Sequence, residues 1–158
     1  MEYKKRMIKY IEYGNVFQLE NVRNYAHGCN CAGAMGKGIA LEFKKRYPEM
    51  YRQYKNLCEK GEFKLGSVFP YNYGGGYVFN LGTQQTWKTK ADLKSIASAL
   101  EKMLLFSEQN NLTKIALPKI GAGLGGLDWA KVKGVIEAVS ASYTNQELYV
   151  VENYKPQE

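Results

Sequence analysis

The chain reads HGCNCAGAMGKGIA over residues 27–40, where one hydrophobic pattern gives way to another. The run that leads into this stretch, Tyr25–Cys29, has the length of a short buried strand. The apolar residues that follow recur at helical spacing as far as Lys60, and Pro48 is expected to break them into two helices. The segment therefore predicts a strand, a glycine-rich loop over Cys31–Gly38 and a helix.

The rest of the chain continues this alternation. Apolar runs predict further strands at Met7–Tyr13, Ser67–Tyr71, Tyr77–Leu81, Ile115–Leu117 and Leu148–Val151. Three consecutive glycines, residues 74–76, make a hairpin of the second and third of these strands. Thr89 with Asp92 has the spacing of a capping box before a helix that ends near Glu108, and Asp128 can cap another helix. We expect an α/β fold, a mixed sheet covered by helices on both faces.

Length and composition predict one compact domain over residues 1–158. Apolar residues make up 45% of the chain, enough for a substantial core. No apolar run approaches the ~20 residues of a membrane helix, and the charged segment 1–10 lacks the apolar stretch of a signal peptide. We expect a soluble cytoplasmic protein with no membrane partner. A zinc site wants four ligands, usually with Cys-x2-4-Cys spacing, and this chain has only His27 to add to its three thiols, so neither a metal nor another cofactor is expected.

Positive charge is concentrated in the first half of the chain. The whole sequence has 22 basic and 15 acidic side chains, a net charge of +7. Residues 1–64 contain 13 basic and 7 acidic side chains (+6), and residues 65–158 contain 9 and 8 (+1). A basic half favours an anionic partner such as a nucleotide, a phosphorylated metabolite or a nucleic acid. The alternative is that the charge serves only solubility.

A second glycine-rich loop, Gly121–Gly126, follows another predicted strand. Glycine lets backbone N–H groups approach a ligand closely, and a helix N-terminus adds partial positive charge, so two such loops suit a diphosphate. Either loop could instead be only a tight connection. The G-x-G-x-x-G spacing of the second loop does not indicate a dinucleotide-binding fold, because the chain ends before the further units that this fingerprint requires. The first loop is not a Walker loop, because Ile39 follows Gly38.

His27 is the only histidine and lies beside the first loop. Imidazole can act as an acid or a base near neutral pH, although a lone histidine is more often a packed core residue. Asn30, three residues later, could hold a sugar hydroxyl, or it could be a turn residue at the end of the strand.

These motifs occur in the order found in a known family. They are the stretch 27–40 with Phe43 and Tyr47-Pro48 behind it, Gly14-Asn15-Val16, Leu117–Gly123 and Gly126–Trp129. Together they resemble the macro domain, the ADP-ribose-binding fold. The resemblance covers nearly the whole chain and implies a three-layer α/β/α sandwich with a mixed sheet of about six strands.

The resemblance also implies a ligand, ADP-ribose or ADP-ribose 1''-phosphate. Adenine would lie near Asn15 and Val16, with Tyr154 as an aromatic neighbour, the diphosphate between the two loops, and the distal ribose near Asn30. The implied binding residues are Asn15, Val16, Asn30, Ala34, Met35, Gly36, Lys37, Gly38, Ile39, Thr83, Gln84, Gly121, Ala122, Gly123, Leu124, Gly125, Gly126 and Tyr154.

Two enzymatic branches of the family are similar to this chain. The yeast-type ADP-ribose 1''-phosphate phosphatases have a histidine where His27 stands. Glycohydrolases that remove ADP-ribose from glutamate or DNA use a lysine where this chain has Gln84, and some use an acid where it has Gly125. Glutamine cannot form the covalent amine adduct, so the phosphatase is the leading hypothesis.

The hypothesis assigns catalysis to His27, Asn30 and Asp128. His27 would activate the attacking water or protonate the leaving oxygen, while the loop N–H groups stabilise the phosphoryl charge. Asp128 is an alternative acid or only a helix cap. A glycohydrolase and a non-catalytic ADP-ribose-binding module remain alternatives, and the basic first half could make weak contact with nucleic acid.

Overall fold

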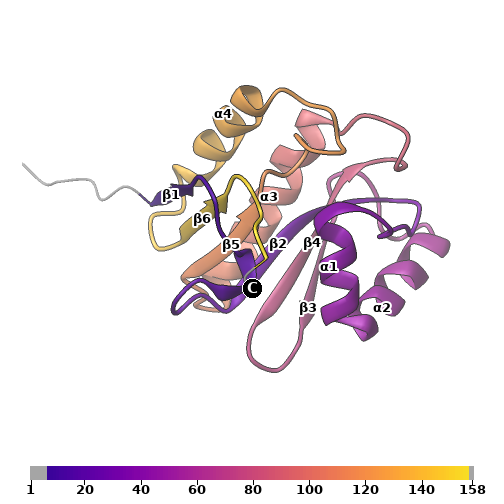
Figure 1. The fold of residues 1–158 in the computed structure, drawn as a ribbon, viewed down its shortest axis with the longest axis horizontal. Helices are drawn as coiled ribbons and strands as arrows, with labels where there is room; N and C mark the ends of the chain where they lie inside the picture. Colours follow the sequence, from indigo (N-terminus) through magenta and orange to yellow (C-terminus); the bar gives the residue numbers. More distant parts are fainter. Residues whose placement is uncertain (1–6, 157–158) are drawn as a thin grey trace, which may run out of the picture.

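The computed structural model describes residues 7–156, which form a central sheet flanked by helices (Figure 1). The strands are β1 (Ile8–Ile11), β2 (Asn24–Asn30), β3 (Val68–Asn72), β4 (Tyr77–Gln84), β5 (Lys114–Pro118) and β6 (Glu147–Val151). The helices are α1 (Gly38–Arg46), α2 (Pro48–Glu59), α3 (Leu93–Gln109) and α4 (Trp129–Ser140), with one 3-10 turn, η1 (Val16–Gln18). The predicted α/β alternation is confirmed, with Pro48 at the first position of α2.

The sheet has the strand order β1-β6-β5-β2-β4-β3. β3 runs antiparallel to β4, and the other neighbouring pairs are parallel, so the predicted mixed sheet of six strands is confirmed. Parallel strands point their carboxyl ends to one edge of the sheet, where ligands of α/β proteins usually bind. The segments that follow β5, β2 and β4 therefore emerge side by side at this edge.

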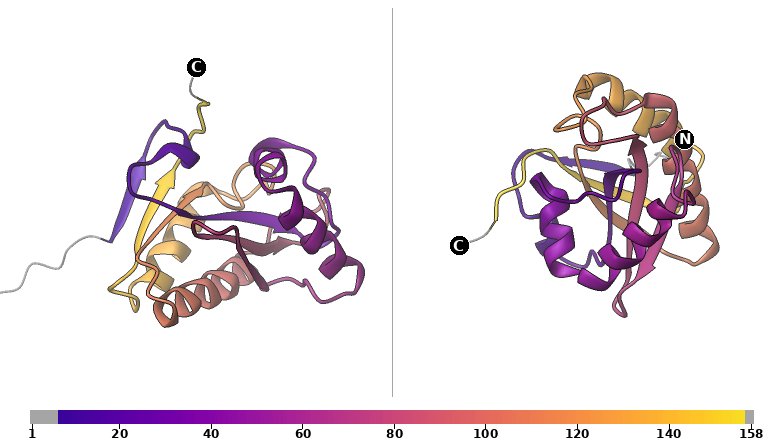
Figure 2. Two further views of the ribbon diagram at one scale, coloured as in Figure 1. Left: turned by 90° about the horizontal axis from the view of Figure 1, so that it is seen from below. Right: turned by 90° about the vertical axis from the view of Figure 1, so that its right-hand side faces the viewer.

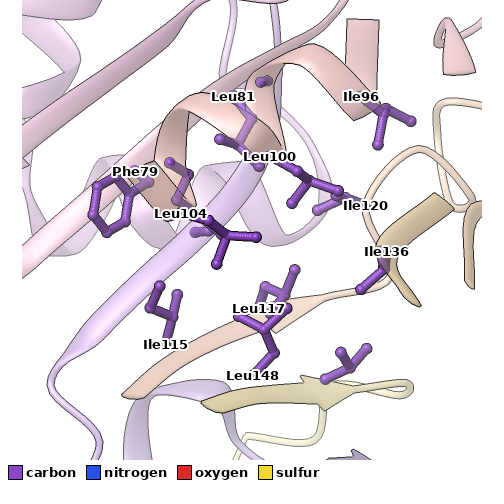
Figure 3. Packing of buried hydrophobic residues seen from close by; sticks show 14 of the residues in the cluster. Phe79, Leu81, Ile96, Leu100, Leu104, Ile115, Leu117, Ile120, Ile136 and Leu148 are labelled. Carbon is purple, nitrogen blue, oxygen red and sulfur yellow. The ribbon is translucent and has the colours of Figure 1, made fainter. Parts of the chain in front are cut away.

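Helices cover both faces of the sheet, with α1 and α2 on one face and α3 and α4 on the other (Figure 2). Side chains along each strand alternate between the two resulting cores. On β4, Val78 packs into the core with α1 and α2, whereas Phe79 and Leu81 pack into the core with α3 and α4. Figure 3 shows the second core, where Leu100 and other α3 side chains lie over the sheet. These layers form the expected three-layer sandwich.

β4 extends three residues beyond the predicted end at Leu81. Polar residues there do not continue the apolar pattern, but the ladder to β2 continues through an irregularity after Cys29, which pairs Asn30 with Gln84. The two amide side chains thus reach the carboxyl edge together. β1, in contrast, is shorter than the predicted strand over Met7–Tyr13.

The predicted start of α3 is wrong by three residues. Asp92, not Thr89, is the N-cap, because its carboxylate accepts hydrogen bonds from the Ser95 N–H at 3.0 Å and the Ser95 hydroxyl at 2.6 Å. The Thr89 hydroxyl instead donates to the carbonyl oxygen of Thr86 at 3.0 Å and closes a turn before the helix. Within residues 7–156, none of the helices is long and apolar enough to cross a membrane.

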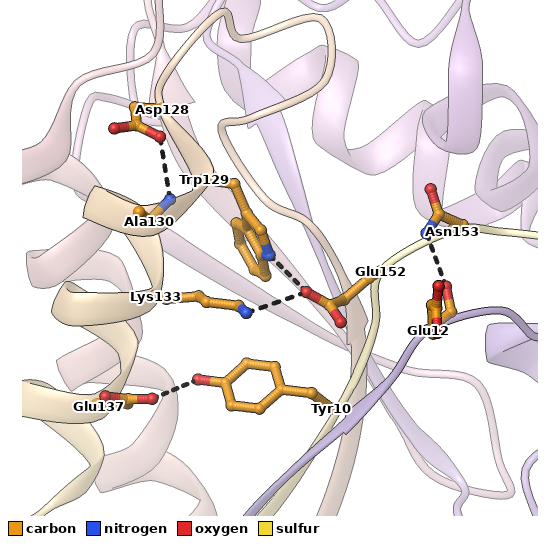
Figure 4. A network of polar contacts seen from close by, with 9 residues as sticks. All are labelled: Tyr10, Glu12, Asp128, Trp129, Ala130, Lys133, Glu137, Glu152 and Asn153. Carbon is orange, nitrogen blue, oxygen red and sulfur yellow. Dashed lines mark hydrogen bonds and ion pairs between the residues drawn. The ribbon is translucent and has the colours of Figure 1, made fainter.

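Polar contacts connect α4 to the segment that directly follows β6 (Figure 4). The Trp129 indole N–H donates to Glu152 at 2.7 Å, and the Lys133 ammonium lies 3.2 Å from the same carboxylate. The hydrogen bond from Trp129 and, less strongly, the charge of Lys133 lower the pKa of Glu152. The Asp128 carboxylate accepts from the Ala130 N–H at 3.2 Å, which makes it the N-cap of α4. These contacts fix the start of α4, and with it the C-terminal end of the second glycine-rich loop.

Candidate functional site

The first glycine-rich loop is folded around the Asn30 side chain at the end of β2. Its Oδ1 accepts hydrogen bonds from the N–H groups of Ala32 at 3.0 Å and Ala34 at 3.2 Å, and its Nδ2 donates to the Ala34 carbonyl at 2.8 Å. The Tyr54 hydroxyl also contacts Asn30, donating to the backbone carbonyl at 2.6 Å. Asn30 therefore shapes the loop with an amide whose oxygen and nitrogen are both engaged.

The helix that follows this loop begins without a side-chain cap. Lys37 is the N-cap of α1 and makes no capping hydrogen bond, whereas α3 and α4 begin at capping aspartates. Within residues 7–156, the backbone N–H groups of Gly36, Lys37 and Gly38 have no hydrogen-bond acceptor. Gly38 has a φ of 62°, which favours glycine at the turn into the helix. An uncapped N-terminus of this kind attracts an anion.

The second loop presents a similar row of N–H groups. The loop is closed by a hydrogen bond from the Leu127 N–H to the Gly121 carbonyl at 2.9 Å and is braced by Ala91, whose N–H donates to the Gly125 carbonyl at 2.9 Å. The N–H groups of Gly123, Leu124 and Gly125 have no acceptor in the described part of the chain. A side chain at Gly123 would enter open space. Consecutive N–H groups in such a turn also bind anions.

A cavity of about 460 Å³ lies between the two loops. Seven of its lining residues were predicted from the sequence: Asn30, Ala34, Met35, Gly36, Lys37, Gln84 and Leu124. Leu124 of the second loop lies against the first loop. A methyl carbon of its side chain is 3.5 Å from the position that a Cβ atom would occupy at Gly38. The remaining lining residues, which sequence reasoning missed, are Gly28, Cys29, Ala40 and Trp87.

Trp87 is the most prominent of the missed residues. Its side chain is 56% exposed, and the ammonium groups of Lys37 and Lys88 lie 5.6 Å and 5.1 Å from its ring centroid. A single tryptophan in a polar segment belongs to no helix or strand period, so the sequence pattern does not predict that it lines a cavity. It reaches the cavity because its segment folds back beside the first loop. The mouth of the cavity is consequently aromatic and positively charged.

His27 lies behind the cavity wall rather than in it. Its ring is fully buried, stacks on Phe43 with centroids 4.1 Å apart, and donates from Nε2 to the Asn80 Oδ1 at 2.6 Å. The Asn80 amide is itself oriented by a hydrogen bond from Nδ2 to the Phe69 carbonyl. Burial lowers the pKa of His27 to about 4, only partly opposed by the bond to Asn80. The neutral, fully packed ring fits the alternative of a core histidine.

The residues expected around adenine are also brought together, outside the cavity. Asn15 caps η1, accepting from the Phe17 N–H at 2.9 Å, and Val16 is fully buried. Tyr154 pairs with Gly14 in an isolated bridge, and its ring lies edge-on to Phe17 with centroids 6.2 Å apart. The N-terminal turn and the C-terminal segment thus lie side by side.

The other predicted residues do not line the cavity. Thr83 is buried and donates to the Cys29 carbonyl at 3.3 Å, and Asp128 is exposed at the start of α4. The predicted positions that lie in or beside the loops without lining the cavity are Gly38, Ile39, Gly121, Ala122, Gly123, Gly125 and Gly126.

Titratable groups are scarce at the cavity. Among residues 7–156, the ionisable side chains that line the cavity are those of Cys29 and Lys37. Burial raises the pKa of the Cys29 thiol well above its usual value. None of the carboxylates in the described part of the chain lines the cavity. Within residues 7–156, no three His, Cys, Asp or Glu side chains are grouped so that they could hold a metal ion. The site therefore offers N–H donors, neutral amides and lysine charge.

The macro domain family model matches residues 26–136 of this chain. The chain belongs to the macro domain family. This macro domain is 31% identical over 150 residues to the DNA ADP-ribosyl glycohydrolase of Thermus aquaticus, covering 92% of the chain but only 41% of the relative. It is 31% identical over 140 residues to the ADP-ribose 1''-phosphate phosphatase of Lodderomyces elongisporus, covering 80% of the chain and 86% of the relative.

Among solved structures, the macrodomain of Mycobacterium tuberculosis DarG superposes on this macro domain with a TM-score of 0.84 at 31% identity. The match covers 96% of this chain and 99% of that one.

Proposed function

We propose that this macro domain binds ADP-ribose derivatives with the diphosphate between its two glycine-rich loops. The observation that carries the proposal is the pair of N–H rows without an acceptor in residues 7–156, at Gly36–Gly38 and Gly123–Gly125, which border one cavity through Gly36, Lys37 and Leu124. Neutral N–H donors at an uncapped helix start and in a glycine turn suit a diphosphate without needing a metal ion. Lys37 adds a positive charge at the same place.

The reaction in the proposal is hydrolysis of ADP-ribose 1''-phosphate. A water oxygen attacks the terminal phosphorus, the bond from phosphorus to the ribose oxygen breaks, and the products are ADP-ribose and inorganic phosphate. One proton of the water reaches the leaving ribose oxygen through an oxygen of the phosphate itself, since no carboxylate of residues 7–156 lines the cavity. The loop N–H groups hold the diphosphate, and Lys37 stabilises the charge on the transferred phosphoryl group.

His27 takes an indirect part in this proposal, in contrast to the role expected from the sequence. Its buried ring supports the wall formed by β2 and β4, beneath the first loop. Asn30 holds the loop in shape, and Asp128 holds the start of α4. All three are positioning residues here.

A glycohydrolase is the second candidate, favoured by the 31% identity to the DNA ADP-ribosyl glycohydrolase of Thermus aquaticus. Two features of this chain oppose it. Gln84 stands at the position of the lysine that the glycohydrolase branch uses, and a side chain at Gly125 would meet the Gly121 carbonyl oxygen at 2.6 Å. An acid at residue 125 would therefore require the second loop to move.

One panel of substrates tests both candidates. The purified protein is incubated with ADP-ribose 1''-phosphate, ADP-ribosylated protein and ADP-ribosylated DNA, and the released phosphate or ADP-ribose is measured. Phosphate release from the first substrate is the expected result. Release of ADP-ribose from a modified acceptor would replace the phosphatase proposal with the glycohydrolase, and tight binding without turnover would identify a non-catalytic binding module.

A further inference from the structure

The side chain of Gln84 is fixed in one orientation at the cavity. Its Nε2 donates to two backbone carbonyl oxygens, that of Thr86 at 2.9 Å and that of Thr89 at 3.2 Å. Only the NH2 end of an amide can satisfy two carbonyl oxygens, so its orientation follows from the chemistry of its partners. The Oε1 of Gln84 accepts no hydrogen bond within residues 7–156.

The turn that holds Gln84 is closed by its own threonines. The Thr89 hydroxyl accepts from the Thr86 N–H at 3.0 Å and donates to the Thr86 carbonyl, and the Thr86 hydroxyl accepts from the Lys88 N–H at 3.2 Å. The backbone of Gln84 is also tied to the first loop, because its carbonyl accepts from the Cys31 N–H at 3.0 Å. The two carbonyls that orient the amide are therefore fixed before a ligand arrives.

The amide oxygens of the two asparagines near the cavity already accept hydrogen bonds. Asn30, the ladder partner of Gln84, uses its oxygen and nitrogen within the first loop. Asn80 is committed to His27 and Phe69. Gln84 is therefore the amide with an available acceptor among those that line the cavity.

We propose that Gln84 positions the nucleophilic water, whose O–H donates to the Gln84 Oε1. This inference rests on the proposed phosphatase function. A neutral amide oxygen accepts a hydrogen bond but does not take the proton, so it turns a lone pair of the water toward phosphorus while the proton passes to a phosphate oxygen. The same position can form no covalent bond to the sugar, as an amine could. Gln84 thereby favours attack of water on phosphorus over formation of a covalent bond between the protein and the sugar.

The variant Gln84→Met tests this role, because methionine has similar length and lacks the amide. Gln85→Met is the matched control, since the neighbouring Gln85 side chain is exposed and does not line the cavity. We expect kcat for phosphate release to fall by about 10²-fold in Gln84→Met, with the dissociation constant for ADP-ribose unchanged. The melting temperature should fall only slightly, because two backbone carbonyl oxygens lose the Nε2 donor. Gln85→Met should behave as the wild type.

A second variant, Thr89→Val, removes the hydroxyl that closes the turn while keeping the carbonyl that orients Gln84. We expect a smaller loss of kcat, again without a change in ADP-ribose affinity.

The possible outcomes separate this inference from the proposed function. Wild-type kcat in Gln84→Met, or an equal loss of kcat and ADP-ribose affinity, would overturn the positioning role while leaving the phosphatase intact. Absence of phosphate release by the wild type would overturn the phosphatase itself.

Discussion

At the scale of single residues, burial decides what a polar side chain can do. His27 and Gln84 lie on neighbouring strands of the same sheet, yet one has a fully packed ring and the other an unpartnered oxygen at a cavity. The difference lies in the neighbours. Phe43 covers the imidazole, whereas the turn beyond β4 contacts only one end of the Gln84 amide.

The buried imidazole predicts how stability depends on pH. His27 has a pKa of about 4 in the folded protein and about 6.5 when unfolded. Between these values the unfolded state binds more protons, so the free energy of unfolding decreases as pH falls, by about 3 kcal/mol in total. This contribution is fully present above pH 6.5.

Urea unfolding of the wild type and His27→Gln at pH 7.5 and pH 4.5 measures this effect. Glutamine does not titrate, so the stability difference between the two proteins should shrink at the lower pH. A difference independent of pH would mean that His27 has an ordinary pKa in the folded protein.

At the scale of elements, the carboxyl edge of the sheet holds the site. Three neighbouring strands end there, and each is followed by a segment that contributes to the cavity: the first loop, the turn that carries Trp87, and the second loop. The second loop is braced on two sides, by Ala91 before α3 and by the fastening of α4 to Glu152. Hydrogen bonds from other segments thus hold its N–H groups in place.

Substitution of two glycines in the second loop should have different effects, one on ADP-ribose binding and the other on the stability of the fold. A side chain at Gly123 enters open space, so Gly123→Val should change the free energy of unfolding by less than about 0.5 kcal/mol while abolishing ADP-ribose binding. A Cβ at Gly125 would lie 2.9 Å from the Ala91 Cβ as well as against the Gly121 carbonyl, so Gly125→Ala should destabilise the fold by about 1–3 kcal/mol.

Calorimetric binding and chemical denaturation of both variants provide the measurement. Gly134→Val is the control, because Gly134 also faces open space but lies on α4 away from the cavity. Full ADP-ribose affinity in Gly123→Val would place the diphosphate elsewhere.

At the scale of the whole molecule, ligand binding should stabilise the fold. A ligand that binds only the folded state at a hundredfold excess over Kd adds about 2.7 kcal/mol. For a domain of this size that corresponds to a rise in melting temperature of about 5–10 °C. Thermal unfolding with and without ADP-ribose measures it, with Gly123→Val as a control that should show no rise. An unchanged wild-type Tm at millimolar ADP-ribose would contradict the binding proposal.

The charge distribution predicts how binding depends on salt. Part of the basic first half is engaged locally: Arg46 lies 4.0 Å above Phe17, and Arg52 pairs with Glu49. We therefore expect only weak DNA binding. The logarithm of the DNA association constant should fall linearly with the logarithm of the salt concentration, with a slope of about −0.9 for each DNA phosphate that the protein neutralises. ADP-ribose, held by neutral N–H groups, should depend little on salt. Titrations at two salt concentrations compare them, and tight DNA binding at physiological salt would favour the modified-DNA glycohydrolase.

The sequence by itself determined the alternation of strands and helices, the break at Pro48 and the two glycine-rich loops. These features depend on neighbours in the chain: the apolar period selects strand or helix, and glycine supplies backbone conformations that other residues rarely adopt. The cap of α3 was misplaced because Thr89 and Asp92 are both capping residues, and only the fold engages Thr89 with Thr86.

The tertiary structure alone decided the roles of the polar residues at the site. Whether His27 meets solvent depends on Phe43 and Asn80. The orientation of Gln84 depends on the turn through Thr86 and Thr89, which is near in the sequence but has no apolar period that would predict it. Trp87 reaches the cavity only because β4 lies beside β2 in the sheet. The burial of His27 and the place of Trp87 arise from contacts between segments that are distant in the sequence, so a local pattern does not predict them.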